Sequence, residues 1–129
     1  MTDQSKNARG RDIFEKVTGL DANAFEASFA GVAEKFPRYA FEWEFADMVG
    51  ESSLDDRSRE LVAITSMAVL GATAAPILRL RIACARRVGI SQQEIIDTFL
   101  QIGIAAGFPC ALAAIGIARE VFAAEDAAA

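Results

Sequence analysis

Apolar residues recur along this chain at the spacing of helix faces, and no segment shows the alternation of a half-buried strand. Glycine and proline interrupt the pattern and mark where one helix should end and the next begin. The sequence therefore predicts an all-α fold. A short helix is expected to end near Gly19, with further helices from Asp21 to Pro37, about Arg38 to Val49, Leu54 to Leu70, Pro76 to Gly89, Ser91 to Gly107 and Pro109 to about Ala124.

Polar residues at the predicted helix starts support these boundaries. Asp21 is a suitable N-cap, and Ser91 with Glu94 forms a capping box, in which each side chain binds the backbone N–H of the other residue. The helix after Asp21 has the most regular apolar face, and Pro37 should stop it. That face consists of Phe25, Phe29, Val32, Ala33 and Phe36.

Two predicted helices carry apolar residues on nearly every side. The helix from Leu54 loses its polar face after Glu60, and such a helix should be buried all round. A chain of this size cannot bury so much apolar surface alone, so an oligomer is expected. The other helix, from about Arg38 to Val49, holds Tyr39, Phe41, Trp43, Phe45 and Met48.

The length of the chain limits it to one domain. Its 129 residues, of which 53% are hydrophobic, are enough for one sizeable core. We expect residues 10–124 to form that domain. Residues 1–9 and 125–129 are expected to be flexible, because they are polar or alanine-rich and lie outside the patterned helices.

Charge and hydropathy exclude several classes of protein. The net charge of −5 argues against nucleic-acid binding, and the basic residues between Arg79 and Arg87 are interpreted as a solvated helix face. Two uncharged runs, Leu61 to Leu78 and Ile102 to Ala118, are broken by glycine and proline, so no membrane association is expected. The polar N-terminus lacks the apolar core of a secretory signal, which favours a cytoplasmic location.

The residue types present restrict the possible chemistry. Histidine is absent, so the usual group that titrates near neutral pH is missing. Cys84 and Cys110 have a spacing that fits neither a zinc site nor a redox pair, and both are interpreted as small buried residues. We expect no metal and no cofactor. Carboxylates with a raised pKa and arginines that hold anions are the groups that remain.

Two segments carry residues at spacings that resemble the carboxymuconolactone decarboxylase family. Leu54 to Leu61 is similar to the family's Leu-Asp-x-Arg-Ser/Thr-Arg-x-Leu entry into its first core helix. The resemblance implies the helical alkylhydroperoxidase D-like fold, assembled as a homotrimer or homohexamer. The second segment consists of Gly89-Ile90-Ser91, Glu94-Ile95-Ile96, Gln101, Ala106-Gly107-Phe108-Pro109 and Ala118-Arg119-Glu120-Val121-Phe122.

The peroxidase branch of this family is the weakest match. The alkylhydroperoxidase D proteins use a Cys-x-x-Cys motif, assisted by a glutamate one helix upstream that Glu60 matches. The motif can be aligned by counting forward from Glu60 or back from Gly89. In neither alignment does this chain have a cysteine at the motif's cysteine positions. A dithiol must be paired to be resolved, so peroxidase activity is ranked third among the possible functions.

The decarboxylase branch carries a histidine where this chain has Arg81, within the run Leu78 to Ile82. Loss of carbon dioxide from a lactone acid leaves a dienolate, which needs electrostatic stabilisation and then a proton. Arg81 can supply the stabilisation but not the proton, because guanidinium stays protonated. Glu60, or Glu44 in the aromatic helix, is expected to supply the proton if burial raises its pKa.

These matches imply cofactor-free lyase or isomerase chemistry on a small hydrophobic or aromatic-derived carboxylic acid. Glu60, Glu44 and Arg81 are the expected catalytic residues. The expected substrate-binding residues are Arg57, Arg79, Trp43 and Phe108.

A structural interpretation stays open beside the catalytic one. Arg57 and Glu60 are three apart on one helix and can form an ion pair, and Arg81 can pair with Glu44 or Glu60 without any substrate. Trp43 and the phenylalanines can belong to the core. The alternative function is therefore a non-catalytic family member that binds a ligand or acts in assembly.

Overall fold

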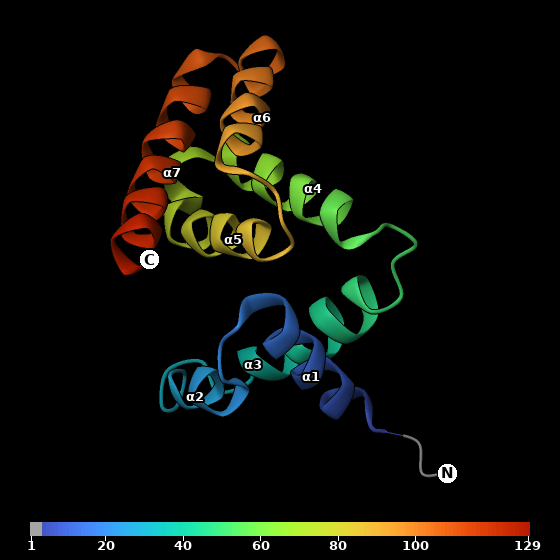
Figure 1. The fold of residues 1–129 in the computed structure, drawn as a ribbon. Coiled ribbons are helices and arrows are strands. Elements are labelled where there is room, and N and C mark those ends of the chain that lie inside the picture. The colour runs from blue at the N-terminus through green and yellow to red at the C-terminus, as the bar shows by residue number, and fades with distance from the viewer. Residues whose placement is uncertain (1–3) are drawn as a thin grey trace. The chain divides into compact units, whose positions relative to one another are not determined.

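The computed structural model describes residues 4–129, where all the regular elements are helices (Figure 1). The prediction of an all-α fold is confirmed. The chain divides into two compact units, Met1–Ser53 and Leu54–Ala129, called here the N-terminal and C-terminal units. The division lies inside the expected single domain of residues 10–124, at the helix-free turn of residues 51–55.

The N-terminal unit is built around one close helix pair. Its helices are α1 (Lys6–Thr18), α2 (Ala22–Ala27), α3 (Phe36–Tyr39) and the π-helix η1 (Ala40–Val49). Gly10 of α1 lies against the backbone of η1, where a Cβ atom would be 1.7 Å from the carbonyl oxygen of Phe41. Beside this contact, the ring of Phe14 meets those of Phe41 and Phe45 edge-on, at centroid distances of 5.3 Å and 5.3 Å.

The helix predicted after Asp21 is much shorter than expected. Asp21 caps α2 as predicted, but α2 ends at Ala27 and residues 28–35 form no further α-helix. Gly31 in that stretch has a φ of 76°, a left-handed conformation that interrupts helical hydrogen bonding. The predicted continuous face is therefore wrong, and Val32 is 88% exposed. The aromatic contacts of that face remain, between Phe25, Phe29 and Phe36.

The aromatic helix has the wider winding of a π-helix. At its end the N–H of Gly50 donates to the carbonyl oxygen of Phe45, five residues earlier, at 2.9 Å. Phe41 and Phe45 are buried, whereas Trp43 is 63% exposed. The aromatic residues of η1 are thus divided between the core and the surface.

Helices extend into both ends of the chain, which the sequence predicts to be flexible. α1 begins within residues 1–9, because the hydroxyl oxygen of Ser5 caps it by accepting a hydrogen bond from the N–H of Ala8 at 3.1 Å. The last helix continues to Ala128, and a hydrogen bond of 3.1 Å from the Gln92 side chain to Asp126 holds its final turn.

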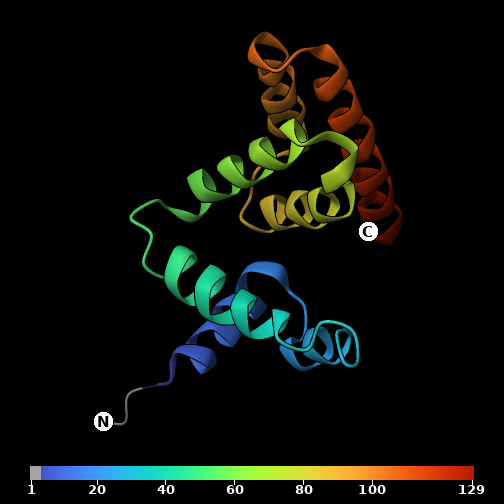
Figure 2. The same cartoon turned by 180° about the vertical axis from the view of Figure 1, so that it is seen from behind.

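The C-terminal unit is a bundle of four α-helices. α4 packs on α5, and α6 runs beside α7 as a hairpin joined at Gly107, whose φ is 95° (Figures 1 and 2). The core lies between these helices and is mainly isoleucine, alanine and phenylalanine. The elements are α4 (Asp56–Val69), the 3-10 helix η2 (Gly71–Ala74), α5 (Ala75–Arg87), α6 (Gln92–Ala105) and α7 (Phe108–Ala128).

The predicted capping box at the start of α6 is confirmed. The hydroxyl oxygen of Ser91 accepts a hydrogen bond from the N–H of Glu94 at 3.0 Å, and the Glu94 carboxylate accepts one from the N–H of Ser91 at 2.8 Å. The two residues fix where the helix begins.

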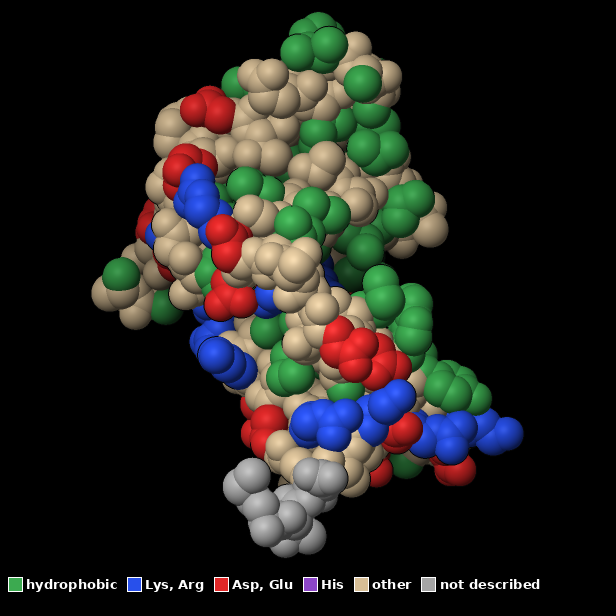
Figure 3. Space-filling model, turned by 90° about the vertical axis from the view of Figure 1, so that its right-hand side faces the viewer, with side chains coloured by type: hydrophobic (Ala, Val, Ile, Leu, Met, Phe, Trp, Pro, Cys, Tyr) green, Lys and Arg blue, Asp and Glu red, His purple; other side chains and the backbone are tan. Residues whose placement is uncertain are grey.

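The prediction that the Leu54 helix is buried all round is wrong for the single chain. On and just after α4, Val62, Val69 and Leu70 are exposed, and hydrophobic side chains reach the surface in Figure 3. None of the described helices has the length and apolar composition needed to cross a membrane. Other large exposed apolar residues of the C-terminal unit are Ile77, Leu100, Ile104, Phe108 and Leu112.

Candidate functional site

α4 places a carboxylate in the apolar core of the C-terminal unit. Glu60 precedes Ile64 and Ala68 at intervals of four residues, so the three side chains share the inward face of the helix. Glu60 is only 1% exposed. Among the residues that the structure describes, its Oε2 is the buried side-chain oxygen without a hydrogen-bond partner. A buried acceptor of this kind is costly unless it becomes protonated or meets a ligand.

α5 brings a cation to this carboxylate. Arg81 lies one turn before Cys84, on a helix whose Leu78 and Ile82 are in the core. Burial raises the pKa of Glu60 above its usual range, while the charges of Arg81 and Arg59 oppose that rise. The net shift shows that desolvation outweighs the two arginines, so protonated Glu60 is favoured more than it is in water.

Cys84 completes the cluster as a neutral thiol. It is fully buried, and burial, with a further contribution from the Glu60 charge, raises its pKa to about 11. A hydrogen bond with Arg81 acts in the opposite direction and links the sulfur to the guanidinium. Both cysteines are free, as expected, but only Cys84 is buried; Cys110 is partly exposed. A thiol held neutral is a poor nucleophile.

Two expected substrate-binding residues lie in surface ion pairs. Arg57 reaches across to α6, with its guanidinium nitrogen 2.5 Å from a carboxylate oxygen of Glu94, rather than pairing with Glu60 on its own helix. This hydrogen bond, with one from the N–H of Ser91, lowers the pKa of Glu94 to about 2. Arg79 similarly lies 2.9 Å from Glu120 of α7.

The remaining expected site residues belong to the N-terminal unit or lie at the surface of the C-terminal unit. Trp43 and Glu44 belong to η1 in the N-terminal unit, so the cluster described here is built from the C-terminal unit alone. Phe108 starts α7 and is 62% exposed. Its ring covers Gly103, where an added Cβ would lie 2.8 Å from the ring. Within the C-terminal unit, the structure thus brings Glu60 and Arg81 together, whereas Arg57, Arg79 and Phe108 are exposed at the surface.

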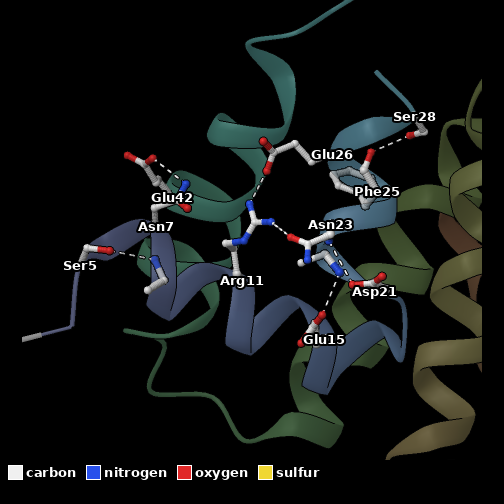
Figure 4. A network of polar contacts seen from close by, with 12 residues as sticks. Ser5, Asn7, Arg11, Glu15, Asp21, Asn23, Phe25, Glu26, Ser28 and Glu42 are labelled. Carbon is white, nitrogen blue, oxygen red and sulfur yellow. Dashed lines mark hydrogen bonds and ion pairs between the residues drawn. The ribbon is translucent and has the colours of Figure 1, made fainter. Parts of the chain in front are cut away.

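A polar network in the N-terminal unit is not evident from sequence spacing. Arg11 of α1 contacts Glu26 and Asn23 of α2 (Figure 4). Its guanidinium carbon lies 4.7 Å from the centre of the Phe41 ring. A hollow of about 380 Å³ opens beside these residues. Because the acid and the amide already hold the guanidinium, this network is best explained as an attachment of α2 to α1.

A second hollow, which the sequence does not predict, lies between α4 and α6. It has a volume of about 370 Å³ and is largely apolar, with Thr65, Thr98 and Gln101 at its wall. The hydroxyl of Thr98 donates to the carbonyl oxygen of Glu94 within α6. Within residues 4–129, no three acidic or cysteine side chains converge as ligands of a metal would.

Comparison with known proteins agrees with this helical arrangement. A sequence model described as the carboxymuconolactone decarboxylase family matches residues 34–120, which include both Glu60 and Arg81. A Paracoccus denitrificans protein named "Uncharacterized 15.0 kDa protein in nqo9-nqo10 intergenic region" is 33% identical over 90 residues, or 70% of this chain and 67% of that protein. The chain therefore belongs to the carboxymuconolactone decarboxylase family.

Proposed function

We propose that the protein catalyses a cofactor-free lyase or isomerase reaction on a small hydrophobic or aromatic-derived carboxylic acid. The observation that carries this proposal is the buried Glu60 carboxyl group, whose unpartnered Oε2 lies in a cluster with Arg81. An acid with a raised pKa and a fixed cation are the two groups that an enolate intermediate requires.

Arg81 acts on the negative charge that develops in the reaction. Its guanidinium is planar, presents five N–H donors and stays protonated, so it can hold a carboxylate or enolate through two parallel hydrogen bonds. Leu78 and Ile82, which flank Arg81 on α5, are buried in the core. In a setting that excludes water, a fixed positive charge stabilises an oxyanion more strongly than it does in solution.

Glu60 acts on the proton. In a decarboxylation, the bond between the substrate carbon and its carboxylate breaks, carbon dioxide leaves, and the electron pair stays on the substrate as an enolate beside Arg81. The proton of the Glu60 carboxyl group then moves to carbon, and solvent returns a proton to Glu60. The raised pKa of Glu60 favours this role, because the acid must carry its proton near neutral pH.

Substitution of Arg81 tests the proposal directly. We expect small aromatic acids and muconolactone-like acids to raise the melting temperature of the wild type. Arg81→Lys keeps the charge but loses the planar fork, so affinity should fall roughly tenfold or more, which corresponds to about 1.4 kcal/mol. Arg86→Lys is the matched control, because Arg86 lies on the same helix in an ion pair with Glu125. The control should bind as the wild type does.

The opposite result favours the non-catalytic alternative. If no acid raises the melting temperature of the wild type, and Arg81→Met melts no lower than the wild type, then Glu60 and Arg81 form a structural charge pair. The proposed reaction would then be abandoned.

The exposed apolar residues support a role in assembly as well. Val62, Val69 and Leu70 lie on one side of α4 and its end, and Ile104 is 82% exposed. Exposed apolar surface is typical of contacts between subunits. We expect a homotrimer or homohexamer, measured by light scattering at micromolar concentration. A stable monomer would contradict this expectation.

A further inference from the structure

In the proposed site, a ligand carboxylate would meet the Glu60 carboxyl group and the Arg81 guanidinium. This inference rests on the proposed function, in which Arg81 holds a carboxylate ligand. Glu60 is 1% exposed, and the structure gives no hydrogen-bond partner for its Oε2. A ligand carboxylate would therefore bring a second negative charge into a buried site beside the first.

We propose that a monoanionic carboxylate bound at Arg81 draws one proton from solvent onto Glu60, so that the ligand itself loads the proton donor. Two carboxylates that share the Arg81 cation, one of them buried, cannot both stay ionised without a large cost, and the less solvated one takes up a proton. The proton would lie between the two acids, or on the Oε2 that otherwise lacks a partner. Binding of the substrate thus also protonates Glu60, the group that later donates the proton.

The charges around Glu60 favour this coupling. Arg81 of α5 and Arg59 of α4 act on Glu60 as cations, and Asp56 of α4 acts as a further anion. Arg59 also lies 3.0 Å from Asp56, which offsets part of its charge. A ligand anion at Arg81 would weaken the larger of the two attractions that keep Glu60 ionised.

Other titratable groups near the cluster do not compete for this proton. Cys84 of α5 has a pKa of about 11 and already carries its proton. Three acids of α6 and α7 pair with other arginines on α4 and α5. These pairs are Glu94 with Arg57, Glu120 with Arg79, and Glu125 with Arg86.

The coupling gives a defined pH dependence of binding. Burial already raises the pKa of Glu60, and the bound anion should raise it further. Below the pKa of the free protein, Glu60 is already protonated and no proton is taken up. Above it, binding takes up as much as one proton, and affinity falls with pH by at most about tenfold per pH unit.

Calorimetry with benzoate as the probe tests this inference. We would titrate benzoate into the full chain at several pH values from about pH 5 to about pH 8, each in two buffers that hold that pH and differ in ionisation enthalpy. The dependence of the observed heat on the buffer gives the number of protons taken up. We expect the wild type to take up as much as one proton, and Glu60→Gln to bind with no uptake and with an affinity independent of pH.

Two controls separate the possible outcomes. Glu94→Gln removes a surface carboxylate whose pKa is already about 2, so it should keep the proton uptake of the wild type. Infrared spectra of the wild type labelled with ¹³C-glutamate should show a protonated carboxyl band that grows when benzoate binds. This second measurement decides the question even if Glu60→Gln does not fold.

The result that overturns the inference differs from the one that overturns the proposed function. Binding of benzoate that requires Arg81 but takes up no proton at any pH in the range overturns the coupling alone. Equal binding to the wild type and Arg81→Met overturns both. If benzoate does not bind the wild type, the coupling is overturned, and the wider panel of acids decides the proposed function.

Discussion

Gly10→Ala is expected to destabilise the N-terminal unit by about 3 kcal/mol or more, at the upper end of the cost of overpacking a core. The added Cβ would lie 1.7 Å from the carbonyl oxygen and 2.4 Å from the carbonyl carbon of Phe41. These are backbone atoms, so no change of rotamer relieves the clash. α1 must move away from η1, and the contacts of Phe14 with the rings of η1 are lost with it.

Denaturant unfolding followed by tryptophan fluorescence measures this effect. Trp43 is the single tryptophan of the chain and lies in η1, so its signal reports on the N-terminal unit. Gly116→Ala lies in the C-terminal unit and is the control, followed by circular dichroism, because an added Cβ there meets no atom within 4 Å. That variant should be as stable as the wild type or gain up to about 1 kcal/mol from helix propensity. A Gly10→Ala protein with the unfolding midpoint of the wild type would contradict the close packing of α1 on η1.

Glu60→Gln is expected to lower the rate of proton transfer to carbon by ~10²–10⁴-fold, the usual contribution of a positioned general acid. Glutamine keeps the size of the side chain and a carbonyl oxygen but cannot give up a proton. The measurement is deuterium incorporation next to the carbonyl of a muconolactone-like acid in D₂O, followed by NMR. Glu94→Gln should exchange at the rate of the wild type. A Glu60→Gln protein that exchanges as fast would remove Glu60 from the reaction.

The same variant changes the pH dependence of stability in a defined direction. The pKa of Glu60 is raised in the folded state, so its contribution is fully present in acid and is lost as the pH rises through the folded pKa. As the pH rises from acid to neutral, the melting temperature of the wild type should fall relative to that of Glu60→Gln. The structural charge-pair interpretation expects the opposite sign, because the ionised Glu60 would then stabilise the fold through the Arg81 cation.

Local signals in the sequence predicted most of the C-terminal unit. The Ser91 and Glu94 capping box and the break at Gly107 are found where the sequence places them. Both are set by a few neighbouring residues, which is why a short stretch of sequence is enough. The N-terminal unit was predicted less well, because Gly31 has a left-handed conformation in a stretch whose apolar spacing is that of a continuous helix.

The candidate site was predicted only in part. Glu60 and Arg81 were expected from their matches to family positions, and the structure brings their charges together. The partner of Arg57 was not predictable, because Glu94 is 37 residues away on another helix. The missing hydrogen-bond partner of Glu60 Oε2 is equally invisible to sequence, since it depends on what surrounds the atom in three dimensions.

Glu94 has a consequence for how this chain tolerates variation. One carboxylate both caps the start of α6 through Ser91 and ties that helix to α4 through Arg57. Aspartate is one methylene too short to span both contacts, and glutamine keeps the cap but gives up the charge. A position that is 44% exposed at its side chain would ordinarily drift freely during evolution. Because the Glu94 side chain stabilises both the start of α6 and the contact of α6 with α4, replacements at Glu94 should be rarer than its exposure suggests.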